Sequence, residues 1–235
     1  MPAKRKSPRK TPTQARAQST VNAILEATIQ VLEREGPAGA TTTRIAEVAG
    51  VSVGTLYQYF SHRDAILDAL QEREFDRALA LLQDVLSVGN LAKSPRETVE
   101  AAVHGMEKLY VAYPGVHRVL AMEGLRTNKA DRLQTFDLRV ISLIRHFISA
   151  TGTPIRRKNV DAAAFVAFQC VRATMLASLL ENPAGLDDKA LVDELVDLVL
   201  RYLVDEEALA ERDGGAPPAS DSRSRVVAAP DVSLA

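Results

Sequence analysis

The stretch that most constrains this chain runs from residue 40 to residue 64, where two short helical patterns flank a single glycine. Threonines at 41–43 can cap the first helix and Ser52 the second, because a hydroxyl accepts from free N–H groups of the first turn. Gly50 lies where the chain must turn, since glycine takes a left-handed conformation without steric cost. We therefore expect a helix, a tight turn and a second helix over 53–60. The residues that would pack inward recur at helical spacing: Ile45, Ala46, Ala49, Leu56 and Phe60.

The second helix of this pair has the length and the side chains of a helix that reads DNA. A helix of about two turns is not stable alone, so a scaffold must hold it, as for helices inserted into a major groove. Thr55 and Gln58 can hydrogen-bond to base edges. Gly54 lets the backbone approach phosphates, which the hydroxyls of Tyr57 and Tyr59 can contact. The alternative is an ordinary helical hairpin, because glycine-turned helix pairs are common.

The same residues carry a family resemblance. The run TTTRIAEVAGVSVGTLYQYFSHRDAIL resembles the DNA-binding signature of the TetR family of bacterial transcriptional regulators, and the match extends over 21–70. The remainder resembles the family in length and helical pattern. The family varies its base contacts at position 53, where valine offers apolar contacts alone. The resemblance implies that eight residues lie at or near DNA: Thr43, Arg44, Val53, Gly54, Thr55, Tyr57, Tyr59 and Arg63.

The predicted fold class is all-α, with an N-terminal three-helix helix-turn-helix DNA-binding domain and a C-terminal helical ligand-binding and dimerisation domain. We expect a disordered basic arm over 1–18, the DNA-binding domain over 19–63, the helical body over 64–211 and a disordered tail over 212–235. Breaks at glycine and proline separate the helices. The first is expected over 20–35, a fourth from a capping box at Ser61 and Asp64, and the others over 95–113, 114–125, 129–150, 157–181 and 188–211.

Composition is that of a soluble globular protein, with 46% apolar and 25% charged residues. No run of about 18 apolar residues is visible, so no membrane span is expected. The N-terminus is polar and lacks the apolar block of a secretory leader. Cys170 is the single cysteine, which excludes an internal disulfide framework and a cysteine-cluster metal site. These features favour a cytoplasmic protein.

Charge is distributed unevenly along the chain. Residues 1–63 hold nine Lys or Arg against four acids, whereas the whole chain has a net charge of −1. A basic head on an acidic body is typical of a DNA-binding module joined to another domain. The first 18 residues carry no acid, and we expect them to follow phosphates or enter a minor groove. The alternative is a solubilising tail or a cloning remnant. The basic residues of this arm are Lys4, Arg5, Lys6, Arg9, Lys10 and Arg16.

The last predicted helix has an apolar surface wider than the single stripe of a surface helix. It must be buried on two sides, so a second subunit is expected on one of them. Ala173 and Ala177, four apart on the preceding helix, would let a partner helix approach closely. The family resemblance implies a four-helix interface from the last two helices, whereas the alternative is a central helix of a monomer. The expected interface residues are Ala173, Ala177, Val196, Val199, Leu200 and Leu203.

The resemblance also implies a pocket for a small, largely apolar ligand inside the helical body, with no cofactor. Sites of this kind combine an apolar wall with a few polar groups. We take as candidates the unusual residues on otherwise apolar helices: His104, Tyr110, His117, Met122, His146, Phe165, Phe168, Gln169, Arg172 and Met175. Arg172 could bind an anionic ligand or pair with Glu181 or a partner subunit's acid.

The functional hypothesis is a homodimeric repressor that binds an inverted-repeat operator in double-stranded DNA and is released by the ligand. Alternatives are a DNA-binding protein without a ligand, controlled by a protein partner, and an activator. An enzyme receives little support. The four histidines form no HExxH or similar spacing, and the chain has no phosphate-binding glycine loop and no GxSxG turn, so no catalytic or metal-binding residue is predicted.

Overall fold

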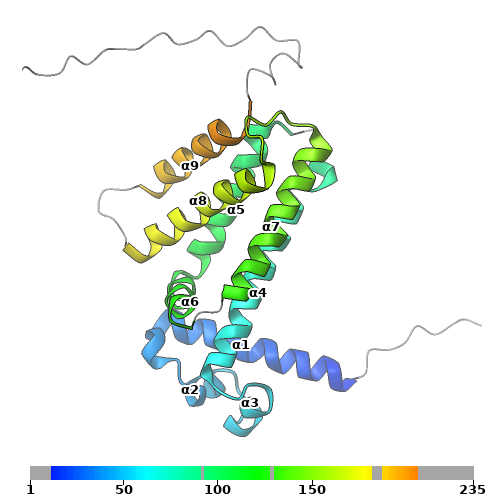
Figure 1. The fold of residues 1–235 in the computed structure, drawn as a ribbon. Coiled ribbons are helices and arrows are strands. Elements are labelled where there is room, and N and C mark those ends of the chain that lie inside the picture. Colours follow the sequence, from blue (N-terminus) through cyan, green and yellow to red (C-terminus); the bar gives the residue numbers. More distant parts are fainter. Residues whose placement is uncertain (1–11, 91–92, 128–129, 182–186, 206–235) are drawn as a thin grey trace, which may run out of the picture.

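The computed structural model describes residues 12–90, 93–127, 130–181 and 187–205. Helices account for the regular structure of these ranges, which confirms the all-α prediction, and a small head lies below a long helical body (Figure 1). The elements are α1 (Pro12–Gly39), α2 (Thr42–Val48), α3 (Val53–Tyr59), α4 (Arg63–Val85), η1 (Val88–Asn90), α5 (Pro95–Ala112), α6 (Pro114–Thr127), α7 (Ala130–Thr151), α8 (Val160–Glu181) and α9 (Asp188–Leu203).

The first helix begins earlier than the sequence predicts. It starts at Pro12 instead of Thr20, so residues 12–18 of the expected disordered arm are helical. Proline is tolerated at the first helical position, and the alanine, glutamine and arginine residues that follow it are good helix formers. The rest of the arm, residues 1–11, lies outside the described residues. Gly36 takes a φ of 71°, so α1 is kinked where the sequence predicts its end, and a further helical turn runs from there to Gly39.

The head core does not end at residue 63, where the sequence analysis places the domain boundary. The first turns of α4 contribute Ile66, Leu67 and Leu70 to the cluster around Ile45 and Leu56. The helix α6 of the body also packs into this cluster, through Val116, Val119 and Leu120. One long helix and two short ones bury too little apolar surface alone, so two helices of the body complete the head.

Two further helix ends differ from the predictions. The capping residue of α4 is His62, whose Nδ1 accepts from the N–H of Ala65 at 3.1 Å, and not Ser61. The helix α9 ends at Leu203 because its last carbonyls are used by a neighbouring segment. The N–H of Arg156 donates to the carbonyl of Leu203 at 3.0 Å, and Ile155 forms an isolated antiparallel bridge with Val204.

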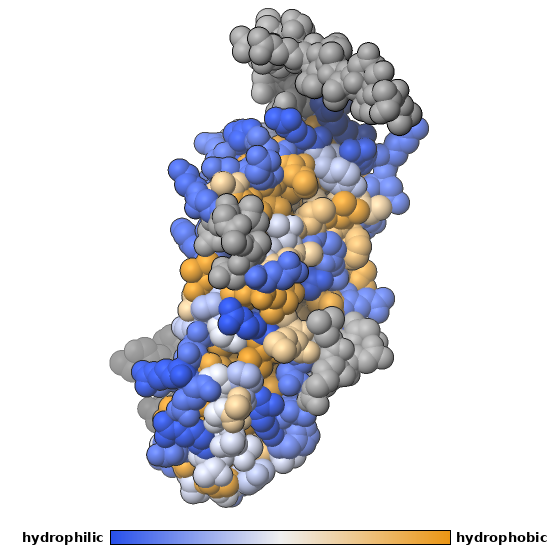
Figure 2. All heavy atoms as spheres, turned by 90° about the vertical axis from the view of Figure 1, so that its left-hand side faces the viewer, coloured by the Kyte–Doolittle hydropathy of each residue, from blue (hydrophilic) through white to orange (hydrophobic). Residues whose placement is uncertain are grey.

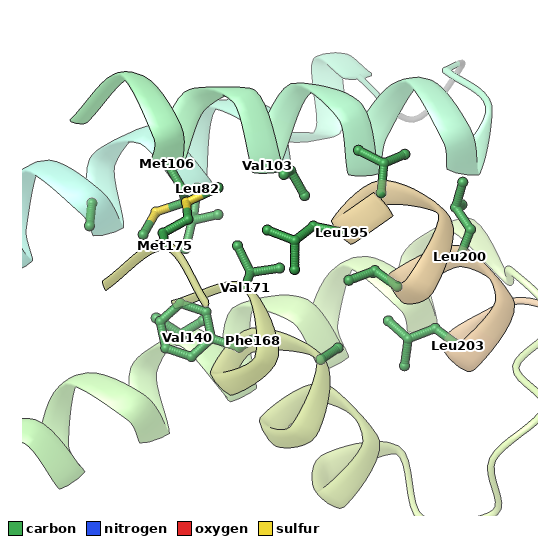
Figure 3. Close-up of a cluster of buried hydrophobic side chains, with 14 of the residues drawn as sticks. Leu82, Val103, Met106, Val140, Phe168, Val171, Met175, Leu195, Leu200 and Leu203 are labelled. Carbon is green, nitrogen blue, oxygen red and sulfur yellow. The ribbon is translucent and has the colours of Figure 1, made fainter. Parts of the chain in front are cut away.

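The body is built around a second apolar cluster, in which α4, α5, α7, α8 and α9 meet. In Figure 3, the labelled side chains of this cluster point into a common space between the helices. Phe136 joins two other rings, stacking on Phe75 at 4.4 Å and meeting Phe168 edge-on at 5.8 Å. The helix α4 runs from the head along the body and packs beside α7, so one rigid element connects the two cores.

The helix α8 is more apolar than the sequence analysis recognised. By length and composition it qualifies as a candidate membrane span, the one such helix found in the described ranges. It packs against α5, α6, α7 and α9. The core helix of a soluble protein passes the same test, because its buried face must also be apolar.

A carboxylate of the head forms a hydrogen bond to the body at the junction between the two. Glu33 of α1 accepts from the N–H of Val116, in the first turn of α6, with Oε1 at 2.8 Å. First-turn N–H groups of a helix have no partner within the helix, and negative charge is stabilised there. Gly115 leaves the room for this contact, since a Cβ would lie 2.9 Å from Glu33 Oε1. The first helix of the head is thereby hydrogen-bonded to the body.

Candidate nucleic-acid interface

The α2–α3 pair is assembled by local capping, as the sequence predicts. Thr41 Oγ1 accepts from the N–H of Arg44 at 3.2 Å, and Ser52 Oγ accepts from the N–H of Thr55 at 2.9 Å. Gly50 turns the chain with a φ of 68°. The N–H of Val51 returns to the carbonyl of Ala46 at 3.0 Å, which closes the end of α2. These contacts fix the direction in which α3 leaves the turn.

The packing of α3 leaves one face of the helix free. Leu56 is fully buried and Phe60 nearly so, whereas Gly54 and Gln58 are exposed. Val53, Tyr57 and Tyr59 keep 36%, 50% and 38% of their surface exposed, although aromatic and branched residues of this size are usually buried. A short helix with its apolar residues anchored and its polar and aromatic residues outward has the form of a DNA recognition helix.

Two hydroxyl pairs orient side chains on this face. Ser52 Oγ lies 2.8 Å from Thr55 Oγ1, and Thr42 Oγ1 lies 3.2 Å from the hydroxyl of Tyr57. The second pair connects α2 to α3 directly. A side chain held by such a contact loses less conformational entropy when it binds. Thr43 is exposed on α2 beside this face.

Arg44, one of the predicted DNA contacts, is already paired with acids. Its guanidinium contacts Glu35 at 2.8 Å and Glu47 at 2.9 Å. Hydrogen bonds to Glu35 and then Glu47 raise the pKa of Arg44 above its ordinary value. Exposed pairs of this kind contribute little to stability, so Arg44 would have to exchange these carboxylates for a phosphate on binding.

Arg63, another predicted DNA contact, is used inside the head. Its Nε donates to the carbonyl of Ala40 at 2.9 Å, and a terminal nitrogen donates to the carbonyl of Pro37 at 3.2 Å. The same guanidinium lies 3.9 Å from Glu123 of α6. The side chain therefore connects the first turn of α4 to the α1–α2 loop and to the body.

Replacement of Arg63 by alanine is expected to lower the free energy of unfolding by about 1–3 kcal/mol, because charge-assisted hydrogen bonds are lost. A residue that contacts a phosphate would also reduce the slope of log Kd against log salt by about one on removal. We expect that slope to stay unchanged. Urea unfolding and DNA titrations at several salt concentrations measure the two quantities, and a lower slope at full stability would restore Arg63 as a DNA contact.

The predicted ligand residues do not gather at one pocket. Met122 and His146 are exposed on the subunit surface, and His104 lies 3.3 Å from Glu107. Met175 packs in the body core. Phe165 is 43% exposed. Their shared property, an unusual side chain on an apolar helix, does not specify which way each one points.

Two of the predicted residues, Gln169 and Arg172, form polar contacts within the body, and two others, Tyr110 and His117, form a ring contact. Gln169 donates to Asp137 Oδ2 at 2.7 Å, and Arg172 donates to the side-chain oxygen of Gln169. Burial raises the pKa of Asp137 despite the nearby Arg172. Tyr110 lies against the ring of His117, with centroids 4.7 Å apart, and burial raises its pKa. The suggested pairing of Arg172 with Glu181 is replaced by Gln169, one helical turn away.

His117 is partly buried between the head and the body. Its Nε2 donates to the carbonyl of Leu109 at 3.0 Å and lies 3.9 Å from Glu74. Burial lowers the pKa of His117 below its ordinary value, and Arg77 acts in the same direction, whereas Glu74, the Leu109 carbonyl and Glu33 oppose the shift. The imidazole is therefore held in its neutral form.

Acidification below pH 6.5 is expected to destabilise the protein through His117. Its folded pKa is depressed, so the unfolded chain binds the proton more tightly. The stability from the neutral ring is present above the ordinary pKa and is lost as the pH falls through the folded pKa. Urea unfolding at pH 7 and pH 5 should show a smaller loss for His117→Gln than for the natural protein. Replacement of the exposed His146 by glutamine is the control, and an equal loss in both variants would contradict the assignment.

Phe168 is the predicted ligand residue that lines an apolar cavity, of about 130 Å³, between α4, α5, α7, α8 and α9. The other lining residues, such as Val99, Ile144 and Val199, could not be identified from the sequence, because they are ordinary aliphatic residues. Their only signal is apolar helical periodicity, which core residues share. Within the described ranges, no group of three or more His, Cys, Asp and Glu side chains is placed to hold a metal ion.

Four of the six predicted interface residues are covered by their own subunit. Val196, Val199, Leu200 and Leu203 are at most 7% exposed and belong to the body core. The other two, Ala173 and Ala177, lie on the outer side of α8 and are exposed or half-buried. Within the subunit, the apolar surface of α9 meets α5 and α8.

The outward face of α8 is apolar instead. Phe165, Val166 and Leu180 keep about two fifths of their surface exposed, and Leu198 of α9 is 46% exposed. Figure 2, which looks onto the side of the molecule where α8 and α9 lie, shows hydrophobic atoms exposed across the body among hydrophilic ones. Surface of this kind is typical of a site of protein association.

The exposed face of α3, the turn at Gly50 and the helical body together define a helix-turn-helix transcriptional regulator. The family model of the tetR family of bacterial regulatory proteins matches residues 24–70, and that of the tetracyclin repressor-like C-terminal domain matches residues 94–203. The chain belongs to the TetR family. Proteins of this family bind DNA operators and form homodimers.

Individual relatives agree with this assignment. The HTH-type transcriptional regulator BetI 1 of Chromohalobacter salexigens is 28% identical over 201 residues, which span 83% of this chain and 92% of that protein. The nucleoid occlusion factor SlmA of Haemophilus ducreyi is 32% identical over 107 residues, 43% of this chain and 50% of that protein. The structure of a candidate TetR-family regulator from Mesorhizobium loti has a TM-score of 0.64 at 14% identity, covering 83% of this chain and all of that one.

Proposed function

We propose that the protein is a homodimeric repressor that reads an inverted-repeat operator and leaves it when a small ligand binds the helical body. The observation that carries this proposal is the exposed face of α3, held outward by the buried Leu56 and the Ser52 cap. The contacts we assign to DNA are Thr43, Val53, Gly54, Thr55, Tyr57, Gln58 and Tyr59, with Arg44 joining them if it leaves its two acids.

Dimerisation through the outward face of α8 would allow the protein to bind two DNA half-sites at once. A two-fold dimer presents two copies of α3, and half-sites are separated by about 34–36 Å, one turn of DNA. Phe165 and Leu198 would lie at the centre of a self-complementary apolar patch. The interface we propose is thus formed by α8 and α9, as in the sequence analysis, but by different residues of those helices.

The position of α4, which extends from the head to the cavity, supports release of the protein from its operator by a ligand. Leu82 and Leu86 near its end line the cavity, whereas its first turn lies beside α3. At 1.5 Å per residue its 23 residues span about 35 Å. A ligand that shifts the far end of α4 would change the spacing of the two recognition helices. Coupling between two sites is usually worth about 1–3 kcal/mol, so we expect ligand to weaken operator binding about 5- to 150-fold.

The test is selection of operators from random duplex DNA by the full-length protein at a stated salt concentration, followed by sequencing. We expect an inverted repeat, and protein with Gln58→Ala should recover a relaxed motif at the same stability. Retention without any motif, lost steeply with salt, would mean that basic residues bind phosphates while α3 reads no sequence. That outcome would contradict the proposal.

A second candidate is a DNA-binding protein controlled by a protein partner, without a small ligand, as a repressor or an activator. One relative, similar over 107 residues, is named as the nucleoid occlusion factor SlmA and not as a transcriptional regulator. Transcription from a reporter that carries the selected operator, with and without cell extract fractions, separates the two. Control by a fraction that heat or protease inactivates would favour the second candidate.

We also infer that the protein acts in the cytoplasm and catalyses no reaction. Its matched relatives are DNA-binding transcriptional regulators, which act where the chromosome lies. Operator binding that needs no turnover of any substrate would support this inference.

A further inference from the structure

The cavity of about 130 Å³ lies at the end of the body remote from α3, and every side chain that lines it is buried or half-buried. Figure 3 shows Val103, Val171 and Leu203 pointing into the space shared by α5, α8 and α9. Leu82 of α4 lies at the same space. The walls come from five helices, so the cavity depends on how the whole body packs.

The lining lacks a group that could hold a polar or charged ligand. Among the described residues that form it, none is charged. Thr98 and Thr153 contribute hydroxyls, and both are engaged within the protein. Thr98 Oγ1 donates to the carbonyl of Ser94 at 3.1 Å, and Thr153 Oγ1 lies 2.7 Å from Thr151 Oγ1. A water molecule needs two to four polar partners to occupy a cavity stably, so this space is suited to an apolar occupant.

The volume limits the size of that occupant. An apolar cavity of about 150 Å³ holds one benzene molecule, whereas sites for drug-sized ligands measure about 300–1,000 Å³. The cavity of this protein, at about 130 Å³, is close to the first case. A long acyl chain or a fused ring system would exceed this volume and would have to extend out of the cavity.

We propose that the cavity binds a neutral, nonpolar molecule of about six to eight non-hydrogen atoms, such as a single aromatic ring or a short branched hydrocarbon. The proposal names the class of ligand that the helical body binds. It rests on the proposed function only for the expected effect of that ligand on operator binding. Carboxylates and organic cations are disfavoured inside it, because the lining offers no charged side chain to pair with them.

The proposal is tested by calorimetric titration of the full-length protein with toluene and with benzoate, which have nearly the same shape but differ in charge. We expect saturable binding of toluene and binding of benzoate at least about a hundredfold weaker. Ala167, which is 4% exposed, lines the cavity. Replacing it with leucine adds an isopropyl group to the space and should weaken toluene binding at least about tenfold. Ala80→Leu makes the same change at an exposed position of α4 and should leave binding unchanged.

The outcomes separate the ligand class from the regulatory mechanism. Absence of saturable toluene binding to the natural protein, or benzoate binding of equal strength, overturns the proposal without any variant. Equal loss of toluene binding in Ala167→Leu and Ala80→Leu also overturns the assigned location, and circular dichroism checks that both variants are folded. Saturable toluene binding that leaves operator affinity unchanged supports the cavity assignment and instead contradicts ligand release in the proposed function.

Discussion

Phe165→Glu is expected to convert the dimer into monomers and to abolish high-affinity operator binding. Phe165 is 43% exposed in the single subunit and lies on the apolar outward face of α8. In a two-fold interface each substitution occurs twice, and a carboxylate buried without a partner costs several kcal/mol. We therefore expect dimerisation to weaken by about 3 kcal/mol or more, roughly a hundredfold or more. Sedimentation equilibrium measures the dimer constant, and operator titration measures the consequence for DNA.

The matched control is Leu138→Glu, the same kind of change at an exposed position of α7. It should leave both the dimer constant and the operator affinity unchanged. A monomeric Phe165→Glu protein with intact helical content would retain weak, salt-dependent DNA binding, because each head still carries its own α3. A dimer constant unaffected by glutamate at both Phe165 and Leu198 would contradict the α8–α9 interface.

Leu56→Ala is expected to lower the free energy of unfolding by about 2–5 kcal/mol, as for other fully buried leucines. Leu56 has no exposed surface and is the side chain by which α3 is anchored to Ile45 and Ile66 in the head core. Because α3 has only about two turns, loss of this anchor should also remove operator binding. Urea unfolding followed by circular dichroism measures the first effect, and operator titration measures the second.

Gln58→Ala is the matched control on the same helix, at an exposed position. We expect its free energy of unfolding to stay within about 0.5 kcal/mol of the natural protein. Its discrimination between operator and mismatched DNA should fall by about 1–3 kcal/mol if Gln58 reads a base. Destabilisation by Gln58→Ala equal to that by Leu56→Ala would mean that the buried and exposed faces of α3 are wrongly assigned.

The DNA-reading unit could be predicted from the sequence because its signals act over a few residues. The caps by Thr41 and Ser52 need only the hydroxyl and the N–H three residues later. The turn needs one residue that accepts a positive φ, and Gly50 supplies it. The inward position of Leu56 follows from helical period alone. Each of these features was expected with the correct residue number.

Partners distant in the sequence could not be predicted in this way. Its position just after α3 predicts that Arg63 contacts a phosphate. In the fold, its guanidinium donates to the carbonyls of Pro37 and Ala40. The burial of Val196, Val199 and Leu200 on α9 was also attributed to a partner subunit, whereas their own subunit covers these side chains. Periodicity measures how wide an apolar face is, but it does not tell whether the same subunit or a partner covers that face.

The sequence by itself therefore determined the helix-turn-helix, the helical body and the family, because capping, turns and helical period are local. Only the tertiary structure decided that α6 completes the head core, that α8 presents an exposed apolar face and that five helices line an uncharged cavity. These features depend on which apolar faces meet when the helices pack, and several pairings bury similar area. The packing of the whole body selects one of them.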